Sequence, residues 1–177
     1  MKHLLLAAVV AAVAVPLAAL AASPYVDQTS RSIKALSDGE VADYLAGRGM
    51  GLAKAAELNG YPGPAHVLEL SEQLALSPAQ RQQTEAIFGR MQDEAKRLGR
   101  RLVDEERELD QLFASKAISP SLLHDKLDSI ASLQSEVREV HLRAHLEEAG
   151  VLSAEQAASY WHLRGYAHGD MEHKHVH

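Results

Sequence analysis

Two histidines four residues apart, His141 and His145, are the first pair of side chains that could bind a metal ion. In a helix this spacing places both imidazole rings on one face, where a single ion can contact both. If this helix pairs with the preceding one as a hairpin, Met91, Asp93 and Glu94 lie opposite His141, and a carboxylate there would be a third ligand or would orient one. The alternative is structural: His141 packs in a helix interface and His145 is a solvated neighbour.

The last ten residues contain a second cluster of metal-binding side chains, His168, Met171, His173, His175 and His177. Alternating histidines bring three rings to one side of an extended chain, and imidazole suits zinc, copper and nickel ions without selecting one geometry. Metal affinity is therefore expected here, either as a functional sensor or store or as weak, adventitious binding. No cofactor is required, and the candidate ions are Zn, Cu and Ni.

A basic stretch precedes both histidine clusters in the sequence. It combines cationic and apolar side chains: Lys96, Arg97, Arg100 and Arg101 with Leu98 and Leu102. Such a surface would attract unfolded polypeptides by charge and then bind them by apolar contact, so these six residues are the predicted client-binding surface. The alternative is an ordinary solvated face, balanced by Asp104, Glu105, Glu106 and Glu108.

The elements that must position these side chains are helices, and an all-α fold is predicted. Apolar residues recur at alternating three- and four-residue steps, and no sustained alternation typical of strands competes with them. Two long helices are expected to pair as an antiparallel hairpin, flanked by short helices in a hooked arrangement of four to five helices. The expected ranges are about 37–58, 66–74, 78–114, 119–149 and 152–164.

A repeated Leu-Ser-x-x-Gln motif marks the start of two of these helices. Its two copies consist of Leu76, Ser77 and Gln80, and of Leu152, Ser153 and Gln156. In a capping box the serine accepts a hydrogen bond from the backbone N–H three residues later, while the glutamine side chain reaches back to the backbone N–H of the serine. Both copies are therefore predicted to be helix N-termini.

The first segment predicts export. Lys2 and His3 precede a long apolar run that ends in the cleavage pattern Ala19-Leu20-Ala21, as in a secretory signal peptide. The alternative is an uncleaved membrane anchor. A periplasmic location is expected, and the chain divides into a signal peptide (1–22), a flexible leader (23–36), a helical domain (37–166) and a His-rich tail (167–177).

Composition excludes several classes of function. The chain has 24 acidic and 18 basic residues and a formal net charge of −6, which argues against a nucleic-acid partner. It has no cysteine, which excludes a disulfide scaffold, a thiolate metal site and a cysteine nucleophile. No catalytic motif is found, so the chain is not expected to be an enzyme.

The two motif copies, within an exported all-helical chain with a long hairpin, resemble the Spy/CpxP family of periplasmic stress proteins, whose signature is Leu-Thr-x-x-Gln. The resemblance covers about 33–166 and includes the segments 47–52 and 57–63. The chain is also similar to a broader group with periplasmic heavy-metal sensor and resistance proteins. The resemblance implies curved dimers, of which some act as ATP-independent chaperones and some bind metal. The metal-sensor branch is implied to use a His-x-x-x-His pair near its N-terminus, but residues 23–65 here contain no histidine.

The expected function is that of an ATP-independent periplasmic chaperone or envelope-stress protein. It would bind unfolded periplasmic proteins as a homodimer, with accessory metal binding. The alternative is a heavy-metal sensor or resistance protein, in which metal occupancy changes contact with a membrane-bound regulator. A third hypothesis is a structural adaptor that binds only a partner.

Overall fold

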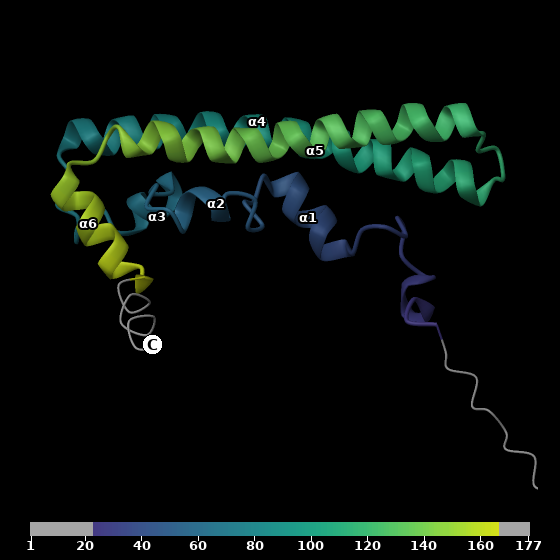
Figure 1. Cartoon of the computed structure of the whole chain (residues 1–177), viewed down its shortest axis with the longest axis horizontal. Coiled ribbons are helices and arrows are strands. Elements are labelled where there is room, and N and C mark those ends of the chain that lie inside the picture. Colours follow the sequence, from purple (N-terminus) through teal and green to yellow (C-terminus); the bar gives the residue numbers. More distant parts are fainter. Residues whose placement is uncertain (1–22, 167–177) are drawn as a thin grey trace, which may run out of the picture.

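The computed structural model describes residues 23–166, and within them the chain is helical without a β-strand. Two long antiparallel helices, α4 (Pro78–Ala114) and α5 (Pro120–Ala149), form a hairpin, as Figure 1 shows. The short helices α1 (Asp38–Ala46), α2 (Lys54–Glu57) and α3 (Pro64–Glu69) follow one side of the hairpin. Helix α6 (Ala154–Leu163) turns away at its base, and a 3-10 turn (Val26–Gln28) precedes α1. The predicted all-α helical hairpin is confirmed.

Local sequence explains where the hairpin helices begin. Ser77 accepts a hydrogen bond from the backbone N–H of Gln80, whose side chain closes the capping box, and Pro78 occupies the first helical position. Ser119 caps α5 in the same way through its bond from the backbone N–H of Leu122. The 37 residues of α4 give a helix about 55 Å long. The predicted hairpin boundaries are therefore confirmed to within a residue or two.

The core of the hairpin is the apolar stripe shared by its two helices. It consists of Ala95, Leu98, Leu102, Ile130, Leu133, Val137 and Val140, all buried. Helix α1 packs on α4 at Gly99, where a Cβ would overlap the backbone carbonyl of Tyr44. A second cluster at the base joins Val67, Leu74 and Leu152 to Tyr160 of α6. The hairpin thus supports α1–α3 on one side and α6 at its base.

The expected helix over 37–58 is wrong, because the chain leaves the helical path at Gly47. Its φ of 66° lies in the left-handed region, and two further positive-φ residues, Met50 and Gly51, follow before α2 begins. Residues 47–53 are therefore not helical, and a separate short helix, α2, begins at Lys54. The helix expected at 66–74 also begins and ends earlier, at Pro64–Glu69.

The leader is anchored at its C-terminal end, contrary to the prediction that residues 23–36 are flexible throughout. Ile33 is only 1% exposed, and the backbone N–H of Lys34 donates to Asp110 Oδ1 of α4 at 3.0 Å. The predicted signal peptide and the His-rich tail lie outside the described residues. Among residues 23–166, no helix has the length and apolarity required to cross a bilayer.

Candidate metal centre

A groove of about 630 Å³ opens between the hairpin and the segment that contains α2 and α3. His141 and His145 line it from α5, and Met91 and Gln92 line it from α4. The opposite wall comes from the interrupted segment after α1 and from the residues around Gly63. The structure therefore brings the predicted histidine pair into one concave site.

His145 is held in a single orientation by the backbone of the opposite wall. Its Nδ1 lies 2.8 Å from the carbonyl oxygen of Tyr61, which can only accept a hydrogen bond. Nδ1 therefore carries the proton, and the lone pair of the neutral ring is on Nε2. The side chain is only 12% exposed, so the prediction that His145 is a solvated neighbour is wrong.

His141 is buried more deeply and is not paired. It is 4% exposed, and its Nε2 has no hydrogen-bond partner among the described residues. Burial, and secondarily the nearby charge of His145, lower the pKa of His141 below its ordinary value. The ring is therefore neutral at neutral pH, with a lone pair available to a ligand that needs one.

Two glycines make room for these rings. A Cβ on Gly63 would lie 2.9 Å from Cε1 and 3.1 Å from Nε2 of His145, which is closer than packed atoms approach. A Cβ on Gly49 would be in ordinary contact with His141, at 3.9 Å from Nδ1. Gly63 therefore sets the position of the His145 ring by lacking a side chain.

Glu57 connects the groove to α6. Its carboxylate accepts hydrogen bonds from the hydroxyl groups of Tyr160, at 2.8 Å, and Tyr166, at 3.0 Å, and from Arg164 Nε, at 3.3 Å. Its Oε2 also lies 3.7 Å from Nδ1 of His145. Glu57 is thus a buried charge shared between the histidine wall and the C-terminal helix.

The expected carboxylate opposite His141 is not found. Glu94 Oε2 instead accepts a hydrogen bond from Arg143 at 3.1 Å, and Asp93 is exposed. Met91 does line the groove with the two histidines. In residues 23–166, no group of three or more His, Cys, Asp or Glu side chains is arranged to hold a metal ion. The described part of the chain therefore offers two imidazoles and a neighbouring thioether.

The structure divides the predicted client-binding residues. Arg97, Arg100 and Arg101 are exposed, and Lys96 is half-buried. Leu98 and Leu102 are each 1% exposed and belong to the hairpin core, so their assignment to a client-binding surface is wrong. The apolar stripe that pairs α4 with α5 cannot also face an unfolded polypeptide.

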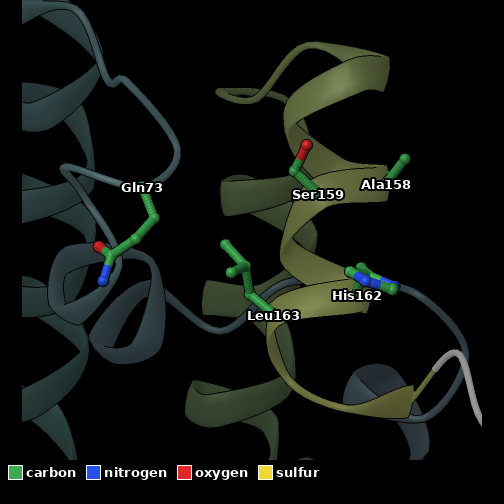
Figure 2. A pocket seen from close by; sticks show the side chains of 5 residues that line it. All are labelled: Gln73, Ala158, Ser159, His162 and Leu163. Carbon is green, nitrogen blue, oxygen red and sulfur yellow. The ribbon is translucent and has the colours of Figure 1, made fainter.

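A second hollow, of about 460 Å³, lies between α6 and the segment before α4. Figure 2 shows that Ala158, Ser159, His162 and Leu163 of α6 line it, with Gln73 across from them. His162 is the one imidazole among these five residues, and it is exposed. This hollow brings no second metal donor of the imidazole or carboxylate type to His162, so the groove at His141 is the better candidate.

Comparison with protein families gives a match that covers most of the described residues. A family model described as heavy-metal resistance matches residues 46–159, which is more than half of the chain. The chain belongs to the heavy-metal resistance family. This family lies within the wider helical periplasmic group to which the Spy/CpxP proteins belong. The matched segment contains the interrupted loop, both hairpin helices and the histidine pair.

No curated protein matches the chain, and no solved structure does. Three groups at the groove were not predicted from the sequence: Glu57, the Tyr61 carbonyl and Gly63. They lie in the segment 57–63 that carried part of the family resemblance, but nothing in its residue types indicated contact with His145. That contact depends on the fold, because the hydrogen bond from His145 to Tyr61 joins residues 84 positions apart.

Proposed function

We propose that this chain is a periplasmic heavy-metal-binding protein, a sensor or a resistance protein, whose groove holds one transition-metal ion through His141 and His145. The observation that carries the proposal is the state of the two rings. His145 donates a hydrogen bond from Nδ1 to the Tyr61 carbonyl and so has a lone pair on Nε2, and the buried Nε2 of His141 has no partner within residues 23–166. Unpaired buried polar atoms are costly, and a bound ion would compensate that cost.

The donor set favours a particular class of ion. Neutral imidazoles prefer zinc, copper and nickel over calcium or magnesium, which take oxygen ligands. The thioether of Met91 at the same groove adds a soft donor that favours copper. A bound ion would supply a fixed positive charge and would join the two histidines of α5 to any further ligand of the ion. The chain itself supplies the orientation: Tyr61 fixes the His145 tautomer, and Gly63 leaves space for the ring.

A sensor must pass occupancy to another surface, and Glu57 offers a connection. Its carboxylate is 3.7 Å from the His145 ring and accepts hydrogen bonds from one side chain within α6, Tyr160, and from two that follow it, Arg164 and Tyr166. A change in the position or charge of His145 would therefore change the docking of α6. Periplasmic location, homodimerisation and contact with a membrane-bound regulator are part of this proposal.

Client capture by a chaperone receives less support from the groove side of the molecule. Its apolar component, Leu98 and Leu102, is internal, although Arg97, Arg100 and Arg101 remain available as a cationic face. A purely cationic face is also the expected result for a solvated helix.

The test is a competition titration of Zn²⁺, Ni²⁺ and Cu²⁺ against a chromophoric chelator, with the full chain at neutral pH. We expect the wild-type protein to bind one ion tightly and the His141→Asn/His145→Asn variant to bind it about 10- to 100-fold more weakly or not at all. His124→Asn is the matched control, because His124 is on the same helix but exposed and paired with Asp128. Equal affinity in the double variant and the control would refute the site.

A further inference from the structure

A carboxyl group is enclosed in the base of the hairpin, where α4 begins and α5 ends. Glu148, in the last turn of α5, is 0% exposed, and its Oε1 accepts a hydrogen bond from the Thr84 hydroxyl of α4 at 2.8 Å. Its Oε2 is equally inaccessible and has no partner within residues 23–166. A carboxylate enclosed in this way is costly, whereas a neutral acid tolerates burial. The closed base therefore favours the protonated form of Glu148.

No neighbouring side chain compensates a negative charge at Glu148. Burial raises its pKa to about 7, the Thr84 bond opposes this shift, and no charged group of the described residues contributes. The titratable side chains on the surrounding elements have other partners: Arg81 of α4 bonds to Ser71, Glu147 and His145 of α5 to Arg90 and the Tyr61 carbonyl, His66 of α3 to Glu69, and Tyr160 of α6 to Glu57. Water must therefore stabilise the ionised carboxylate, and the base has to open to admit it.

Helix α6 is the part of the base with the fewest attachments. Figure 1 shows that it turns away from the hairpin, and its buried apolar contact is the small cluster in which Leu152 and Tyr160 meet Val67 and Leu74. Its hydrogen bonds to the rest of the molecule come from three side chains: Gln156 bonds to Gln80 and the Leu74 carbonyl, Tyr160 to Glu57 and Gly63, and Arg164 to Glu57. Units with few buried contacts open before the rest of a fold.

The chain connects Glu148 directly to these attachments. Helix α5 ends at Gly150, two residues after Glu148, and the carbonyl of Val151 accepts from Gln80 at 2.9 Å. Leu152 then packs in the small cluster, and α6 begins at Ala154. Water that reaches the Glu148 carboxylate through the last turn of α5 therefore disturbs the segment that docks α6.

We propose that Glu148 is a proton-dependent switch for the docking of α6: the neutral acid keeps α4, α5 and α6 closed around it, and the carboxylate releases α6 from the base. The switch requires no metal ion, so it goes beyond the proposed function and does not depend on it. Release would break the bonds of Tyr160 and Arg164 to Glu57, whose carboxylate lies 3.7 Å from Nδ1 of His145. It would also withdraw Arg164 and Tyr166 from the wall of the groove.

The direction of the response follows from proton linkage. A solvated carboxyl has a pKa near 4.5, so between this pH and about 7 the closed base holds a proton that the open base has lost. The opening equilibrium of α6 therefore rises with pH over this range and levels off above it. Between pH 6 and pH 8 the expected increase is about 10-fold.

The experiment measures hydrogen exchange of the full chain by mass spectrometry at pH 6 and pH 8, with a chelator present. Each exchange rate is divided by the intrinsic rate at the same pH to give a protection factor. We expect the protection of α6 in the wild type to fall about 10-fold between the two pH values, and to lie below that of the hairpin core around Leu98 and Val137 at pH 8. Glu148→Gln should remove the fall, because an amide does not ionise. Glu139→Gln, exposed on the same helix, is the matched control and should retain it.

Thr84→Val provides a second variant that keeps the carboxyl group. The Thr84 bond lowers the pKa of Glu148, so its loss raises that pKa further and should enlarge the fall in α6 protection between pH 6 and pH 8. An unchanged or smaller fall in Thr84→Val would contradict the switch.

Three results would overturn the proposal. The first is an α6 protection that stays constant between the two pH values in the wild type. The second is an equal fall in Glu148→Gln, which would assign the response to another group. The third is equal protection of α6 and the hairpin core at pH 8, which would mean that the base opens only when the whole protein unfolds. None of them affects the proposed function, because no metal ion takes part in the measurement.

Discussion

The side-chain amide of Gln80 donates a hydrogen bond to Oε1 of Gln156 at 2.7 Å, which joins the two copies of the repeated helix-start motif. Each glutamine also closes its own capping box, with its Oε1 accepting from the backbone N–H of Ser77 or Ser153. The first turns of α4 and α6, more than 70 residues apart in sequence, are therefore held together by the residues that start them. The repeated motif therefore forms a tertiary contact between the two helices in addition to capping each of them.

Replacing Gln80 with alanine should destabilise the protein by about 1–3 kcal/mol. The change removes the bond to Gln156 and leaves the carbonyl of Val151, which accepts from Gln80 Nε2 at 2.9 Å, without its partner. Urea unfolding followed by circular dichroism measures the free energy of unfolding. Gln82→Ala, at an exposed position in the same helix turn, should have almost no effect. Equal unfolding midpoints for the two variants would contradict a stabilising contact between Gln80 and Gln156.

Stability should fall as the pH rises from about 5 to about 8 because of Glu148. This residue is fully buried, and its Oε1 accepts from the Thr84 hydroxyl at 2.8 Å, while its Oε2 has no partner in the described part of the chain. Burial raises its pKa to about 7. A raised carboxyl pKa means that the folded state holds a proton that the unfolded state has lost. Its contribution is therefore complete below the unfolded pKa of 4.5, is lost as the pH rises to about 7, and amounts to at most about 3 kcal/mol.

Glu148→Gln should remove this dependence and raise stability at pH 8 relative to the wild type, because the amide stays neutral and its oxygen still accepts from Thr84. Chemical denaturation at the two pH values measures the change. Glu139→Gln, on the same helix but exposed, serves as the control and should keep the wild-type slope. A wild-type slope in Glu148→Gln would mean that another group causes the pH dependence.

Gly63→Ala should weaken metal binding without touching a ligand. The φ of −89° at Gly63 suits alanine, so the cost is the collision of the new methyl group with the His145 ring, 2.9 Å from Cε1. The ring must move, and its bond to the Tyr61 carbonyl is lost. A Zn²⁺ titration and thermal unfolding measure both effects. Gly89→Ala, where a Cβ meets nothing within 4 Å in the middle of α4, should instead stabilise the protein by about 0.5–1 kcal/mol. Wild-type affinity in Gly63→Ala would show that the ring position is unimportant.

Tyr160→Phe should cost about 1–2 kcal/mol of stability. The hydroxyl donates to Glu57 and accepts from the backbone N–H of Gly63 at 3.2 Å, and the side chain is 2% exposed. Denaturant unfolding tests the value against Tyr25→Phe, which alters an exposed tyrosine and should be neutral. Tyr160 links α6 to both Glu57 and Gly63. An unchanged free energy of unfolding in Tyr160→Phe would therefore show that these bonds do not hold α6 to the groove.

The parts of the fold that sequence predicted well are those with local signals. Ser77 and Ser153, each followed three residues later by glutamine, mark helix starts by chemistry within a single turn, and both are capped as expected. The break in the helix at Gly47 was not predicted. The capping box at Ser37 favours a helix from that residue onward, and the bend at Gly47 depends on packing against α4, where Gly47 lies close to Lys96.

The shared position of the two histidines was predicted from local spacing, whereas their surroundings were not, and metal binding by the pair stays a prediction. The spacing of His141 and His145 placed both rings at one groove, since helical periodicity is local. Glu57 and Gly63 could not be assigned, because their roles depend on contacts over more than 80 residues. Leu98 and Leu102 were predicted to lie on a client-binding surface, but they belong to the buried apolar stripe between α4 and α5.

The burial of His141 also determines how acid and metal would compete for the site. A proton and a metal ion need the same lone pair of the His141 ring. Because desolvation lowers the pKa of this ring, a proton binds it more weakly than it binds a histidine in water. Acidification therefore protonates His141 later than a histidine in water. If the groove binds an ion as proposed, a proton competes with that ion for His141 only at a lower pH than it would for a solvated histidine.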